Sequence, residues 1–73
     1  MPSEVRFAEL RKLLESHGWT LDRVKGSHHI FVRPGAHNVV LPVHRGKCKA
    51  VYRRLILEAI ETLHRPKPRG RAD

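Results

Sequence analysis

The sequence has a single cysteine, Cys48, and no long run of apolar residues, and each scarcity excludes a class of protein. One cysteine excludes an intramolecular disulfide and a zinc site built from cysteines alone. The longest apolar runs extend over a few residues, far short of a membrane-spanning helix. The first residues also lack the basic start and the apolar stretch of a secretory signal peptide. We therefore predict a cytoplasmic protein that does not associate with a membrane.

Acidic residues are missing from a long central part of the chain. The sequence has 15 Lys and Arg against 7 Asp and Glu, a net charge of +8, yet no acidic residue lies between Arg23 and Leu57. A one-sided positive field attracts polyanions, so nucleic acid is the first candidate partner. A solvated basic surface and a patch for an acidic protein are the alternatives. The Lys and Arg residues of this part are Arg23, Lys25, Arg33, Arg45, Lys47, Lys49, Arg53 and Arg54.

The apolar pattern predicts two helices near the two ends of the chain. Apolar residues at spacings of three and four predict a helix that opens at Pro2 or Ser3 and closes at Gly18. The same periodicity predicts a second amphipathic helix from about Lys47 to Leu63. We expect residues 1–63 to form one domain. Residues 64–73 alternate basic residues with Pro or Gly and are expected to be a flexible basic tail.

Three strands are predicted between these helices. Strand-like patterns cover residues 19–24, 28–33 and 38–43, with turn residues at Gly26 and at Pro34-Gly35. Such short links favour an antiparallel meander. The expected fold is therefore α+β in the order α-β-β-β-α, with a three-stranded antiparallel sheet and two helices on one of its faces.

The two aromatic residues of the predicted strand segments, Trp19 and Phe31, have two possible uses. They could stack on bases, as single-strand binders require. A domain of this size has few large side chains, however, so we expect Trp19 and Phe31 to fill its core.

The segment Gly26-Ser27-His28-His29 is the strongest candidate for chemistry. Glycine allows a tight turn that exposes backbone amides to an anion, and histidine transfers protons near neutral pH. Because strand residues alternate, His28 and His29 should point to opposite faces of the sheet, so only one can serve a given site. The alternative is that both are ordinary strand histidines beside a tight turn.

A metal site is a weaker interpretation of the histidines. His28, His29, His37 and His44 are possible ligands, and Cys48 could join His44. Adjacent histidines in a strand diverge, however, and no Asp or Glu lies nearby in the sequence to complete a tetrahedral set. The sequence also contains no P-loop, no Gly-x-Gly-x-x-Gly, no paired carboxylates and no nucleophile elbow. We therefore expect neither a metal nor a cofactor.

Taken together, these motifs resemble the HicA toxins of bacterial toxin–antitoxin systems. The resemblance covers about residues 5–61 and includes the Leu-Leu-x-x-x-Gly-Trp segment of residues 13–19. Its most specific parts are Lys-Gly-Ser-His-His-Ile-Phe at residues 25–31 and Val-Val-Leu-Pro-Val-His-Arg-Gly-Lys at residues 39–47. Many family members carry Lys-x-Leu-x-x-Gly-Thr-Leu before the last helix, whereas this chain has Lys-Cys-Lys-Ala-Val-Tyr at residues 47–52.

The resemblance implies a double-stranded-RNA-binding-like fold with ribonuclease activity on messenger RNA. The catalytic histidine of the family follows Gly-Ser, which implies His28, with His29 in reserve. The resemblance also implies a HicB antitoxin that covers the active face, so we expect a monomer when the chain is free and a hetero-oligomer with the antitoxin. The residues expected to contact RNA lie on the turns that carry the histidines, namely Lys25, Gly26, Ser27, Arg45 and Lys47.

Two other functions are compatible with the same residues. A non-catalytic RNA-binding module would use shape and phosphate contacts, with the histidines incidental. A protein-interaction domain would use the basic surface to recognise an acidic partner and would have no RNA affinity at physiological salt.

Overall fold

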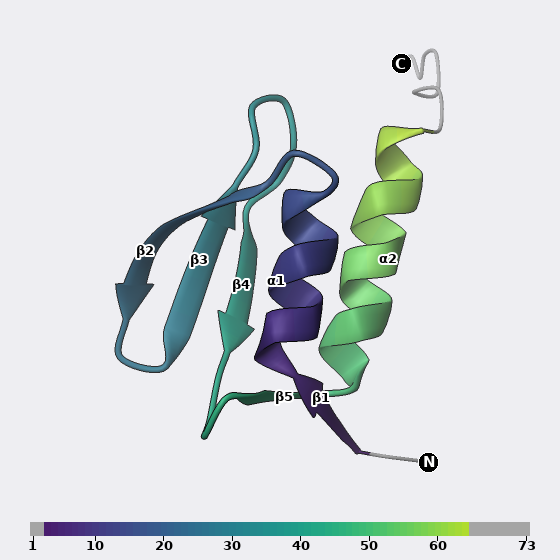
Figure 1. The fold of residues 1–73 in the computed structure, drawn as a ribbon. Helices are drawn as coiled ribbons and strands as arrows, with labels where there is room; N and C mark the ends of the chain where they lie inside the picture. The colour runs from purple at the N-terminus through teal and green to yellow at the C-terminus, as the bar shows by residue number, and fades with distance from the viewer. Residues whose placement is uncertain (1–2, 65–73) are drawn as a thin grey trace, which may run out of the picture.

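Two helices cover one face of a three-stranded antiparallel sheet, which confirms the predicted α-β-β-β-α arrangement (Figure 1). The computed structural model describes residues 3–64. The elements in chain order are β1 (Glu4–Arg6), α1 (Phe7–Glu15), β2 (Thr20–Lys25), β3 (His28–Val32), β4 (Val39–Pro42), β5 (Lys47–Lys49) and α2 (Val51–Leu63).

The main sheet has the strand order β2-β3-β4, so β3 is central and both β2 and β4 are edge strands. Its strands begin and end within two residues of the predicted ones. In β2 the register shifts between Leu21 and Arg23, where Asp22 forms an irregularity. Such a bulge increases the local twist of an edge strand.

The core lies between the sheet and the helices. Leu10 and Leu14 of α1 and Ile56 of α2 are fully buried against Phe31 and Leu41 of the sheet. Each helix contributes residues at the predicted spacing of three to four, so its apolar stripe faces the sheet. Burial of this stripe stabilises the domain because apolar surface is removed from water.

Trp19 and Phe31, which could have either stacked on bases or filled the core, both belong to the core. Trp19 is 1% exposed and Phe31 is 0% exposed, which confirms the prediction. The indole Nε1 of Trp19 donates a hydrogen bond to the backbone carbonyl of His37, 3.1 Å away. This bond ties the loop between β3 and β4 to the core, so Trp19 also positions that loop.

The predicted helix starts are wrong, because a two-stranded ribbon takes their place. Glu4–Arg6 and Lys47–Lys49 pair antiparallel as β1 and β5, so α1 begins at Phe7 and α2 at Val51. In both strands an apolar residue lies between two charged ones, and Val5 and Cys48 point into the core. Packing of this pair outweighs helix formation, since extending either helix would turn its apolar side chain away.

The predicted tail falls almost entirely outside the described residues. His64 closes α2 through its backbone N–H, which donates to the carbonyl of Glu61 at 3.1 Å, and residues 65–73 lie beyond the part of the chain described. Over residues 3–64, neither helix has the length and the apolar character needed to cross a membrane.

Candidate functional site

Two tight turns lie at the same end of the molecule, where both helices begin (Figure 1). The first joins β2 to β3, with Lys25 and His28 as paired residues around Gly26 and Ser27. Gly26 has φ +59°, whereas Ser27 has no positive φ. A glycine at the first central position of a two-residue turn is typical of type II′, whose twist matches that of a β-hairpin. The sequence therefore places His28 directly at the first residue of β3.

The second turn spans His44 to Lys47 and leads into β5. The backbone N–H of each of these two residues donates to the carbonyl of the other, at 2.9 Å in both directions. The central residues, Arg45 and Gly46, have φ values of +54° and +74°. Two left-handed residues in succession are typical of a type I′ turn. Among residues 3–64, Arg45 is the one residue other than glycine that has a positive φ. This backbone conformation is unfavourable for arginine.

Backbone hydrogen bonds hold the two turns together. The N–H of Val43, just before the second turn, donates to the carbonyl of Ser27 in the first, at 2.8 Å. The N–H of Phe7 donates to the carbonyl of Gly46, also at 2.8 Å. The start of α1 thus fixes the second turn, and β4 fixes the first. Residues that are far apart in the sequence form one rigid surface.

The two adjacent histidines occupy different environments, as strand alternation predicts. His29 faces the helices, and its ring lies 4.6 Å from that of Phe7, measured between centroids. Its Nδ1 is 3.4 Å from the carbonyl oxygen of Ser27. His28 is exposed and points to the other face of the sheet, which neither helix covers. His28 is therefore accessible to a large ligand, whereas half-buried His29 is held by its neighbours.

Exposed cations lie on and beside the two turns at this end of the molecule. Lys25 is the cross-strand partner of His28, so the two side chains lie next to each other on the open face of the sheet. Arg45 projects from the second turn, and Lys47 follows it as the cross-strand partner of Arg6. We call these four cations, Arg6, Lys25, Arg45 and Lys47, the basic cluster.

Within the described part of the chain, no ion pair compensates the charge of the basic cluster. Among residues 3–64, ion pairs involve Arg11, Arg23 and Arg53, and none involves a member of the basic cluster. Arg6 and Lys47 are like charges directly opposite each other, a pairing that destabilises a ribbon. The first turns of α1 and α2 lie at the same end and add a partial positive charge. The arrangement attracts an anion to this end of the molecule.

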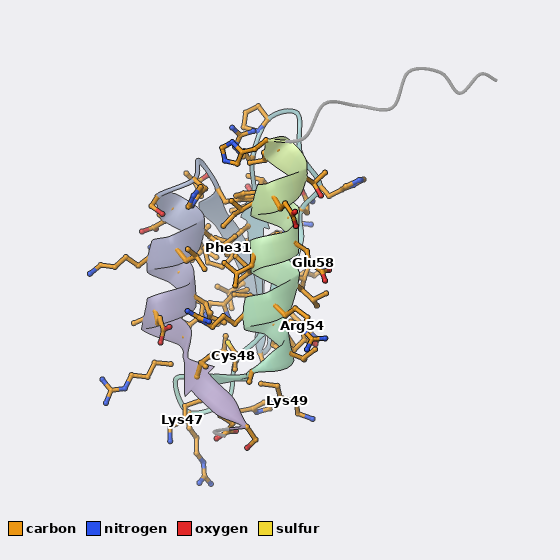
Figure 2. The ribbon with its side chains drawn as sticks, turned by 90° about the vertical axis from the view of Figure 1, so that its right-hand side faces the viewer. Phe31, Lys47, Cys48, Lys49, Arg54 and Glu58 are labelled. Carbon is orange, nitrogen blue, oxygen red and sulfur yellow. The ribbon has the colours of Figure 1, made fainter. Side chains whose placement is uncertain are left out.

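The other potential metal ligands are not brought together. His37 lies in the loop between β3 and β4, at the opposite end of the sheet from His28. Within the described part of the chain, no three His, Cys, Asp or Glu residues are grouped so that they could hold a metal ion. Cys48 is 2% exposed, and its burial raises the pKa of its thiol. Figure 2 shows it inside the molecule between Lys47 and Lys49 of β5, and not near a free surface.

The predicted site residues fall on these two joined turns, Lys25, Gly26, Ser27 and His28 on the first and Arg45 and Lys47 on the second. Arg6 was missed as a member because its segment was predicted to be helical. The pattern Glu4-Val5-Arg6, which alternates charged and apolar residues, was the signal for a strand.

Comparison with known protein families matches residues 7–61 to the HicA toxin of bacterial toxin–antitoxin systems. The match covers more than half of the 73-residue chain and includes both turns of the surface described above. Comparisons with curated proteins and with solved structures found no match. The order of the elements, the motif residues and the extent of the family match agree. The chain belongs to the HicA family of toxins from bacterial toxin–antitoxin systems.

Proposed function

We propose that this toxin is a cytoplasmic ribonuclease that cleaves messenger RNA with His28 as the proton acceptor. The observation that carries the proposal is the exposure of the His28 imidazole on the open face of the sheet, next to Lys25 and at the end of the molecule that carries the basic cluster. An RNA strand drawn to these cations brings its phosphates to the only kind of side chain there that accepts a proton at neutral pH.

The proposed reaction is an intramolecular transesterification. The neutral imidazole of His28 takes the proton of a ribose 2′-hydroxyl, and the 2′-oxygen forms a bond to the adjacent phosphorus. The bond from phosphorus to the 5′-oxygen breaks, and that oxygen takes a proton from water. The products are a 2′,3′-cyclic phosphate and a 5′-hydroxyl. General base assistance of this kind accelerates a reaction by about 10²–10⁴-fold.

The basic cluster stabilises the additional negative charge on the phosphate in the transition state. Lys25 is closest to His28 in the sheet, while Arg45 and Lys47 come from the turn that is bonded to the histidine-bearing one. Backbone amides at Gly26 and Ser27 add further donors. Fixed donors and charges lower the barrier because they need not reorganise during the reaction. No step of this mechanism requires a metal ion.

A HicB-type antitoxin is the proposed protein partner. The family is that of toxins from toxin–antitoxin systems, in which an antitoxin neutralises the toxin. A partner that carries carboxylates to the basic cluster would occupy the phosphate positions and exclude RNA. We propose that the free toxin is monomeric and that the neutralised form is a hetero-oligomer.

The test of this function is incubation of the purified chain with end-labelled RNA in excess EDTA. The proposal predicts fragments, because the chemistry requires no metal ion. Binding that weakens steeply with salt but yields no fragments would instead support a non-catalytic RNA-binding module. An absence of RNA affinity at physiological salt would support a domain that recognises an acidic protein.

Replacing Arg45 by asparagine is expected to separate stability from RNA binding. The Asn-Gly pair is favoured in type I′ turns, so Arg45→Asn should stabilise the fold by about 1 kcal/mol. The midpoint temperature of thermal unfolding should then rise by roughly 4–8 °C. The lost cation should weaken RNA binding and lower the slope of log affinity against log salt by about 1. Stabilisation with unchanged RNA affinity would remove Arg45 from the proposed site.

A further inference from the structure

An apolar groove runs along the free edge of the sheet, away from the basic cluster. It has a volume of about 1000 Å³ and lies between edge strand β4 and helix α2. None of the residues that line it is Lys, Arg, Asp or Glu, although 30% of the whole sequence is charged. Its main apolar residues are Val39, Val40 and Leu41 on β4 and Tyr52, Leu55 and Ala59 on α2.

Two apolar residues that line this groove, one on β4 and one on α2, are substantially exposed. Val40 is 43% exposed and Leu55 is 48% exposed, so both present apolar surface to water. Figure 2 shows Arg54 and Glu58 on the exposed side of α2, where they flank Leu55 in the sequence. The groove itself is lined by apolar and uncharged polar residues, as in an interface rather than an RNA contact.

The backbone of β4 is arranged to receive another strand at this edge. The bond from the N–H of Val43 to the carbonyl of Ser27 fixes the alternation along the β3–β4 pair. Residues 39 and 41 then direct their N–H and C=O groups toward β3, whereas Val40 directs both of its groups outward. Pro42 also faces outward but has no N–H, so a pairing strand must centre on Val40.

We propose that β4 and the groove bind an extended strand of an acidic partner protein by edge pairing. In this mode main-chain hydrogen bonds supply affinity, and alternate side chains of the added strand fill pockets beside the edge. Here the groove supplies the pockets and Val40 supplies the backbone donor and acceptor.

The charge of the chain decides which occupant fits. A second copy would bring a net charge of +8 against a net charge of +8, which disfavours self-pairing, whereas an acidic chain is attracted. The partner is the antitoxin proposed above, so this inference rests on the proposed function. It assigns to that antitoxin a second contact, separate from the basic cluster.

The test measures binding of a purified HicB-type antitoxin to the full chain by titration calorimetry, with two variants and two matched controls. Val40→Pro removes the outward N–H of β4, and edge strands tolerate proline. Val24→Pro makes the same change on the other edge strand, β2, where Val24 is 49% exposed and faces outward by the same alternation. Leu55→Glu adds a charge inside the groove, and Leu57→Glu adds one to the 43%-exposed Leu57 of α2, outside it.

Val40→Pro and Leu55→Glu should each weaken antitoxin binding by about tenfold or more, and the two controls by less than about twofold. Hydrogen exchange should show the Val40 amide unprotected in the free chain and protected in the complex. Equal losses in variants and controls, or a Val40 amide that stays unprotected in the complex, would overturn the inference. So would a dimer of the chain alone, detected by light scattering, that Val40→Pro dissociates.

RNA cleavage by the same proteins keeps the two proposals separate. The inference predicts that Val40→Pro and Leu55→Glu cleave RNA like the unmodified chain but resist inhibition by the antitoxin. If the unmodified chain does not cleave RNA, the proposed nuclease activity is wrong. The antitoxin-binding measurements then still decide whether the groove binds the antitoxin. Failure of any HicB-type antitoxin to bind the unmodified chain contradicts both the proposed partner and the groove.

Discussion

Replacing His28 by alanine is expected to lower the rate of RNA cleavage by about 10²–10⁴-fold while the protein remains folded. The imidazole is exposed at the first residue of β3 and takes no part in the core, so its removal leaves the packing intact. The loss should appear in the rate of cleavage at saturating RNA. Affinity for RNA should change little, because the basic cluster remains in place.

His37→Ala is the matched control for this experiment. His37 is also exposed, but it lies at the other end of the sheet, and its contact with Trp19 is made by its backbone carbonyl. The His37→Ala variant should therefore cleave RNA at the rate of the unmodified protein. Cleavage by His28→Ala at that same rate would show that His28 is not the proton acceptor. A loss confined to His29→Ala would transfer the role to the reserve candidate.

Phe31→Ala is expected to unfold the domain almost completely. Phe31 is 0% exposed in the central strand, where its neighbours across the sheet are Leu21 and Val39. Its ring also lies 6.1 Å from that of Phe7, the residue that contacts His29. Truncating a buried phenylalanine destabilises a protein by about 3–5 kcal/mol. That is as much as a single core of this size normally supplies.

The measurement is denaturant or thermal unfolding followed by circular dichroism, with Phe31→Leu as the control. Leucine keeps most of the apolar volume, so Phe31→Leu should remain folded at 25 °C with reduced stability. An alanine variant that unfolds with the midpoint of the unmodified protein would mean that Phe31 is not central to the core. RNA cleavage should be lost together with the fold, because His29, Phe7 and the two turns depend on the same packing.

The spacing of apolar residues predicted the two long helices and the main strands, because each of these elements buries one face against the core. The apolar spacing in α1 and α2 and the β-branched and aromatic residues of β3 leave few alternatives. The β1–β5 ribbon was missed because each of its strands is three residues long and lies next to a strong helical pattern. Its formation depends on pairing between residues more than 40 positions apart, which local patterns do not report.

The residues of the candidate site were identifiable, but their arrangement was not. Gly26 before His28 predicts a turn followed by a strand, and Arg45-Gly46 marks a second turn. The bond between Val43 and Ser27, which joins these turns, arises only when β4 pairs with β3. The contribution of Arg6 and the edge groove follow likewise from tertiary pairing.

The chemistry of the cleaved ends distinguishes attack by the ribose 2′-hydroxyl from attack by water. An RNA oligonucleotide and the same oligonucleotide with one 2′-deoxynucleotide at the cleavage site are incubated with the chain in EDTA, and the fragments are analysed by mass spectrometry. If His28 activates the 2′-hydroxyl, the RNA should give 2′,3′-cyclic phosphate and 5′-hydroxyl ends, and no cleavage should occur at the 2′-deoxy position. Cleavage at that position, or fragments with 5′-phosphate ends, would contradict this mechanism, because water and not the 2′-hydroxyl would then be the nucleophile.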